Sequence, residues 1–131
     1  MGKTAEHVYK GLAGMIYIED KESKALNLPT CYARNDILLV VQDRVFDGNR
    51  QLDYSPTMMQ LCQGYMGDTY LVNGVISPYF NAEAGLLRLR ILNGSNARVY
   101  RLAFDDSREF ALIGWRQLLC DVSRFTFGSH I

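Results

Sequence analysis

Short stretches in which apolar and polar residues alternate recur along this chain, and they predict β-strands. Residues 15–19 would place Ile16 and Ile18 on one face of a strand and Met15 and Tyr17 on the other. Further strands are expected at residues 37–41, which are apolar on both faces, and at 69–72, 75–77, 86–92 and 99–104. Only residues 19–28, which end before Pro29, have a partly helical pattern.

Turn-rich segments separate these strands, at residues 47–49, 64–68 and 93–96. Asn73-Gly74 predicts a tight hairpin, because both residues tolerate positive φ in a type I′ turn. Several short strands at close spacing with polar turns predict an all-β fold, a sandwich or a Greek key. The charged segment 19–24 is the best candidate for a linker.

Composition excludes several classes of partner. The 131 residues include 14 basic and 14 acidic side chains, so the formal net charge is zero and nucleic-acid binding is not expected. No apolar run approaches the roughly 20 residues of a membrane span, and no basic-then-apolar secretory signal opens the sequence. The odd count and wide spacing of Cys31, Cys62 and Cys120 predict buried or partly buried free thiols rather than a zinc site.

Several blocks of the sequence resemble bacterial multicopper oxidases of the laccase and cuprous-oxidase type. The blocks are Gly2-Lys3-Thr4 with Gly11-Leu12-Ala13-Gly14, residues 36–43, residues 67–74 and residues 87–98. The resemblance implies an incomplete cupredoxin-like Greek-key β-sandwich. Residues 1–20 would be the terminal strand or strands of domain 1, exposing apolar faces at Leu12, Met15 and Ile16. Residues 21–131 would be a truncated domain 2, atypical from about residue 115.

Copper chemistry in this family depends on histidines that this sequence does not supply. The family has a His-x-His-x-His run just before the Gly-Lys-Thr, and its trinuclear cluster takes eight histidines in four His-x-His pairs. This chain has only His7 and His130, and neither lies in such a pair. We therefore expect no catalytic, cofactor-binding or metal-ligating residue here, and copper only in a full-length parent. For Met58, Met59 and Met66, core packing is favoured over Cu(I) binding.

The remaining motifs have simpler explanations than a site. Gly2-Lys3-Thr4 lacks the upstream glycine and strand of a phosphate loop, and Asn93-Gly94-Ser95 fits a turn better than a glycosylation sequon. The pairs Glu19-Asp20 and Asp105-Asp106 are expected to be solvated turn residues. Arg88, Arg90 and Arg98 are expected to form surface or interdomain ion pairs. The loss of resemblance at residues 115–121 suggests a local frameshift or a chimeric gene end.

Two functional hypotheses follow from the resemblance. The first is a fragment of an oxidase whose periplasmic parent would couple oxidation of phenols or Cu(I) to reduction of dioxygen to water. The chain alone would be inactive, and without a signal it would stay in the cytoplasm. The alternative is a copper-free cupredoxin-like structural or division-associated periplasmic protein. In either case the expected partners are the missing cupredoxin domains, with self-association possible through exposed strand edges.

Overall fold

The computed structural model describes residues 3–18, 21–106, 108–113 and 123–127, with the backbone alone at 22–23 and 123–127. The chain divides into two compact units, Met1–Ala97 and Arg98–Ile131. Within the described residues, no helix is long and apolar enough to cross a membrane.

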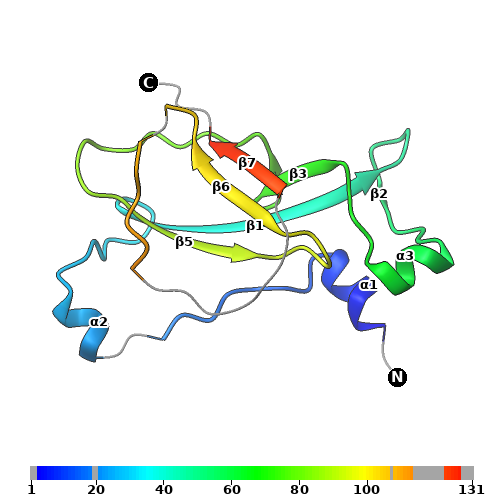
Figure 1. Cartoon of the computed structure of the whole chain (residues 1–131), viewed down its shortest axis with the longest axis horizontal. Coiled ribbons are helices and arrows are strands. Elements are labelled where there is room, and N and C mark those ends of the chain that lie inside the picture. The colour runs from blue at the N-terminus through cyan, green and yellow to red at the C-terminus, as the bar shows by residue number, and fades with distance from the viewer. Residues whose placement is uncertain (1–2, 19–20, 107, 114–122, 128–131) are drawn as a thin grey trace. The chain divides into compact units, whose positions relative to one another are not determined.

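The first unit is built on β1 (Asp36–Phe46), the strand expected at residues 37–41 and longer than expected (Figure 1). β5 (Arg88–Asn93) runs parallel to its first half, with Leu89 opposite Ile37. β3 (Thr69–Val72) pairs antiparallel with its second half, and β2 (Leu52–Asp53) pairs with its last two residues. The result is a mixed sheet; an all-β fold was predicted, and the described chain is mostly β, with three short helices beside the strands.

The hairpin predicted at Asn73-Gly74 is present and joins β3 to β4 (Val75–Ile76). Both turn residues have positive φ, 51° at Asn73 and 79° at Gly74, as a type I′ turn requires. The Asn73 side chain also extends the pairing toward β1. Its Oδ1 accepts from the Val40 N–H at 2.8 Å, and its Nδ2 donates to the Leu38 carbonyl at 2.9 Å.

Helices are more frequent than the sequence pattern indicated. α2 (Lys21–Ala25) confirms the helical tendency of residues 19–28. α1 (Thr4–Tyr9) and α3 (Met58–Gln63) were not predicted. Each has only six residues, too few for a helical repeat of apolar positions to be visible. α3 is stabilised by a capping box between Thr57 and Gln60.

The prediction of a strand at residues 15–19 is wrong. Residues 12–18 carry no strand assignment, and residues 19–20 lie outside the described part. The predicted alternation of faces nevertheless appears, since Met15 is half-buried while Ile16 and Ile18 are exposed. A strand assignment needs a hydrogen-bonded neighbour, and none of the strands of the described residues pairs with this segment.

The second unit contains β6 (Tyr100–Phe104), which confirms the strand expected at 99–104, and β7 (Ser123–Phe127), which pairs with it in parallel. Phe104 contacts Phe110 edge-to-face at 6.0 Å between ring centroids. After β6, Asp105 and Asp106 lie exposed in a turn, as predicted. Residues 114–122, which include most of the atypical stretch, are outside the described residues.

Candidate functional site

Arg90 makes the best-defined polar contact of the first unit. Its Nε and Nη2 each donate to a carboxylate oxygen of Asp36 at 2.7 Å, and its guanidinium lies 3.5 Å from the ring centroid of Tyr17. The parallel register places Asp36 opposite Arg88 and Leu38 opposite Arg90, so Arg90 and Asp36 share a face two residues apart. The hydrogen bonds from Arg90 to Asp36 raise the pKa of the guanidinium further above its usual value.

For Arg90 a surface or interdomain ion pair was expected. The ion pair is present but does not lie at the surface, because the side chains of Arg90 and Asp36 are only 15% and 7% exposed. The pair lies inside one compact unit and joins residues 15–18 to the sheet through Tyr17. The Arg90 guanidinium bonds a buried carboxylate on one side and contacts an aromatic ring on the other, so it holds the two in a fixed arrangement.

Tyr9, at the end of α1, anchors that helix to β1. Its ring is almost fully buried against Tyr54 and Tyr65, with centroid distances of 4.8 and 5.2 Å. Its hydroxyl accepts the Val45 N–H at 2.6 Å, and the Arg44 guanidinium lies 4.7 Å from the ring centroid. Burial raises the pKa of Tyr9 to about 12, with the Val45 N–H opposing the shift.

Asp43 and Gly67 hold the neighbouring loop against β1. The buried Asp43 carboxylate accepts the Gly67 N–H at 2.7 Å, and the Asp43 N–H donates to Ser95 Oγ at 3.1 Å. A side chain at position 67 would collide with the backbone of Arg44, so glycine is required there. The sequence pattern did not single out Tyr9, Asp43 or Arg44. The available signal was the charged pair Asp43-Arg44, which follows the apolar run 37–41 after one residue.

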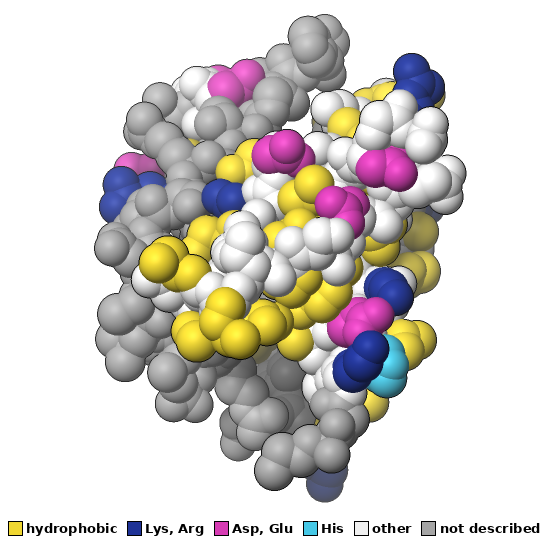
Figure 2. All heavy atoms as spheres, turned by 90° about the vertical axis from the view of Figure 1, so that its right-hand side faces the viewer, with side chains coloured by type: hydrophobic (Ala, Val, Ile, Leu, Met, Phe, Trp, Pro, Cys, Tyr) yellow, Lys and Arg dark blue, Asp and Glu magenta, His cyan; other side chains and the backbone are white. Residues whose placement is uncertain are grey.

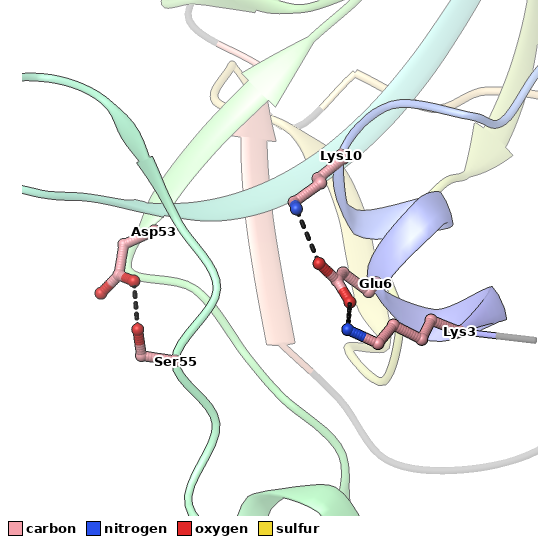
Figure 3. A network of polar contacts seen from close by, with 5 residues as sticks. All are labelled: Lys3, Glu6, Lys10, Asp53 and Ser55. Atoms are coloured by element: carbon pink, nitrogen blue, oxygen red, sulfur yellow. Dashed lines mark hydrogen bonds and ion pairs between the residues drawn. The ribbon is translucent and has the colours of Figure 1, made fainter.

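The surface of α1 carries a separate charge network (Figure 3). Glu6 lies between Lys10 at 2.6 Å and Lys3 at 3.4 Å, and the hydrogen bond from Lys10 is the main cause of its lowered pKa. Lys3 is the residue before α1 and Thr4 is its first residue. Lys3 and Thr4 thus lie at the start of a helix, and the Lys3 ammonium pairs with Glu6. Figure 3 also shows Ser55 donating to Asp53 on the neighbouring β2 loop.

A hollow of about 370 Å³ opens between α1 and α3. Asn96 lines it and donates from Nδ2 to the Ala5 carbonyl at 2.9 Å, while its buried Oδ1 has no hydrogen-bond partner. Figure 2 shows hydrophobic side chains gathered on the side of the molecule where these helices lie. The polar side-chain groups that line the hollow are amides, hydroxyls and the Cys62 thiol. These groups do not make an acid–base pair.

The sulfur-containing side chains differ from expectation. Core packing was predicted for Met58, Met59 and Met66, but all three are exposed. Met58 and Met59 lie on α3, which buries none of its residues. Cys31 and Cys62 are free, as predicted, yet both are exposed rather than buried. Cys120 lies outside the described residues.

The side chains of the described residues do not fit a copper site. His7 is exposed on α1, and His130 lies outside the described residues. Within the described part of the chain, no group of three or more His, Cys, Asp or Glu side chains could hold a metal ion.

The turn at Asn93-Gly94-Ser95 was correctly predicted, since Asn93 Oδ1 accepts the Ser95 N–H at 3.0 Å.

Comparison with known proteins gives two groups of relatives. No family model matches the chain. The cell division protein FtsP of Xenorhabdus nematophila is 44% identical over 115 residues, which are 88% of this chain and 24% of that protein. The multicopper oxidase mco of Staphylococcus epidermidis is also 44% identical, over 110 residues, which are 84% of this chain and 24% of that protein.

A solved structure extends the likeness to the backbone. The McoA multicopper oxidase of Aquifex aeolicus superposes with a TM-score of 0.66 at 47% identity, covering 73% of this chain and 21% of that one. The chain therefore spans about a quarter of the length of the curated relatives that it matches.

Proposed function

By sequence and by backbone this chain is related to part of the multicopper oxidases, and we propose that it serves as a copper-free packing domain of such a protein. The parent would couple oxidation of phenols or Cu(I) to reduction of dioxygen to water, in the periplasm. The copper ligands would come from its other cupredoxin domains. With two histidines in the sequence, this chain would be inactive alone.

The contact of Arg90 with Asp36 and Tyr17 is the observation that carries this proposal. Tyr17 lies in the stretch expected to close domain 1, and Arg90 and Asp36 lie in the sheet of the expected domain 2. An arginine shared between the two stretches would fix the angle at which consecutive domains meet. A packing domain needs such a rigid junction, whereas a catalytic domain would need ligands or acid–base groups.

The second candidate is a structural protein without copper, because relatives named as cell division protein FtsP match as well as the oxidases do. FtsP of Photorhabdus laumondii is 45% identical over 112 residues, close to the 44% of the staphylococcal oxidase. The packing role of this stretch would be the same in both. The codons before Gly2 in the parent gene distinguish them: a His-x-His run there supports the oxidase, and non-ligand residues support the structural protein.

Copper titration of the chain, followed by visible absorbance and paramagnetic resonance, tests whether it is copper-free. We expect no blue band at about 600 nm, the signature of a Cu–thiolate type 1 site. A blue band that appears in proportion to added copper would overturn the proposal.

Limited proteolysis tests the junction itself. Arg90→Leu removes the contact with the Tyr17 ring and leaves Asp36 buried without its counter-ion, at a cost of about 3 kcal/mol. We expect chymotrypsin to cut after Tyr17 several times faster in this variant, and Arg90→Lys to give an intermediate rate. Arg34→Leu is the matched control, because Arg34 pairs with Glu83 while both side chains are mostly exposed. Equal cleavage in all variants would contradict a fixed junction.

A further inference from the structure

Two asparagines of the first unit directly precede a glycine, Asn73 before Gly74 and Asn93 before Gly94. Asparagine is thermolabile, because the backbone nitrogen of the next residue can attack its side-chain carbonyl carbon. Glycine has no side chain to hinder that nitrogen, so these two steps are the most reactive asparagines of the chain by sequence. The neighbouring residues do not distinguish the two steps, but their contacts with β1 do.

At Asn93 the attacking nitrogen is held. The Gly94 N–H donates to the Val41 carbonyl at 2.8 Å, and Asn93 itself lies opposite Val41 in the pairing of β5 with β1. Gly94 is buried, and a Cβ at that position would lie 3.0 Å from the side chains of Val40 and Gln42. The nitrogen can therefore reach the Asn93 side chain only when β5 separates from β1, which amounts to opening the centre of the sheet.

At Asn73 the attacking nitrogen is not held. Gly74 is exposed, and among the described residues its N–H has no hydrogen-bond acceptor. The step is held instead at Asn73, whose side chain bonds Val40 and Leu38 and whose own N–H donates to the Val40 carbonyl. The side-chain bonds lie beyond the last residue pair of β1 with β3. Fraying of this end releases the Asn73 side chain without opening the rest of the sheet.

We propose that Asn73 is a site of spontaneous deamidation in the folded chain, and that β1 protects Asn93 from the same reaction. The Gly74 nitrogen forms a bond to Asn73 Cγ, the bond from Cγ to Nδ2 breaks, and ammonia leaves with the proton of the Gly74 N–H. Water then opens the cyclic imide to aspartate or isoaspartate. In sum, an amide and a water become a carboxylic acid and ammonia, and nothing is oxidised or reduced. The inference is independent of the proposed packing function, because the reaction needs neither copper nor another domain.

The modification would loosen the β3–β4 hairpin. Nδ2 of Asn73 donates to the Leu38 carbonyl, and deamidation replaces it with a carboxylate oxygen, which repels that carbonyl. Isoaspartate also adds a main-chain carbon to a two-residue turn whose geometry depends on positive φ at Asn73 and Gly74. Deamidation would therefore weaken, irreversibly, the bonds by which the turn is attached to β1.

Mass spectrometry of tryptic peptides tests the site, because trypsin leaves Asn73 in residues 51–88 and Asn93 in residues 91–98. During incubation of the folded chain in mildly alkaline buffer, we expect Asn73 to convert at least about tenfold faster than Asn93. In urea, where β1 protects neither step, the two rates should agree within about twofold. Equal or reversed rates in the folded chain would overturn the proposal. So would an unchanged Asn73 in the folded chain while the chain in urea converts at both positions.

Substitution by the product tests the consequence. Asn73→Asp should raise the equilibrium constant for unfolding at least about fivefold at neutral pH, because the donor to the Leu38 carbonyl is lost. Asn81→Asp is the matched control, since Asn81 is exposed and the same change of charge there should leave unfolding unchanged. Equal effects of the two substitutions would contradict the proposed loosening of the hairpin.

Discussion

Tyr9 shows how one hydroxyl can join a helix to a strand. Its ring packs among aromatic neighbours, and its oxygen accepts the N–H of Val45, where β1 is paired only briefly by β2. The N–H would otherwise lack a partner at the point where the sheet narrows. A buried donor without an acceptor costs more than the net value of an ordinary hydrogen bond, so this contact matters beyond its area.

Tyr9→Phe should lower the free energy of unfolding at neutral pH by about 1–2 kcal/mol, because Val45 loses its acceptor. It should also flatten the alkaline loss of stability. The pKa of Tyr9 is about 12 in the folded chain and 10.0 ordinarily, so its contribution is complete below pH 10 and is lost as the pH rises toward 12. Urea unfolding at several pH values measures both effects.

The exposed Tyr79 supplies the control for this prediction. Tyr79→Phe removes a hydroxyl from the surface and should change neither the neutral stability nor its pH dependence. If Tyr9→Phe loses stability above pH 10 as steeply as the parent chain does, then the Tyr9 hydroxyl is not the group that titrates.

At the scale of elements, the sequence predicted what depends on neighbouring residues and missed what depends on distant ones. The hairpin at Asn73-Gly74 was predicted because its turn chemistry is local. The faces of residues 15–18 were also right, but their status as a strand was wrong, since pairing is set by a partner elsewhere. The Arg90–Asp36 pair depends on a parallel register across 54 positions, which no local pattern encodes.

The same distinction explains the missed helices and sulfur side chains. α3 has a visible capping box at Thr57 and Gln60, yet six residues are too few for periodicity to indicate which side is buried. Met58 and Met59 therefore looked like core residues by type alone. Their exposure follows from how α3 lies on the unit, and that is not readable from the sequence.

Asn73 does more than turn the chain, and Asn73→Gly separates its two roles. Glycine keeps the positive φ but loses the side-chain bonds to Val40 and Leu38, so we expect a loss of about 1–3 kcal/mol of stability. The midpoint of urea unfolding measures it. Asn49→Gly is the control, because the hydrogen bond from Asn49 to Asp47 uses the backbone N–H. Equal shifts for the two variants would assign the effect to glycine flexibility alone.

For the whole molecule, the balance between buried and exposed apolar side chains sets the kind of stability that the chain can have. Among the described residues, the buried hydrophobic side chains are Tyr9, Ile37, Val41, Tyr65, Leu71 and Val72. Far more large hydrophobic side chains are exposed, on α3, on residues 12–18, on β4 and along the loop between β4 and β5. Exposed apolar area of this extent is typical of a surface that other protein covers.

We therefore expect shallow urea unfolding of the chain, because little apolar area is newly exposed. The slope should fall toward or below the lower end of the range for small proteins, about 1–3 kcal/mol per molar urea. An apolar dye such as anilinonaphthalene sulfonate should bind the native chain. A steep transition without dye binding would mean that the chain buries these side chains by itself, and that it needs no neighbouring domain to complete its core.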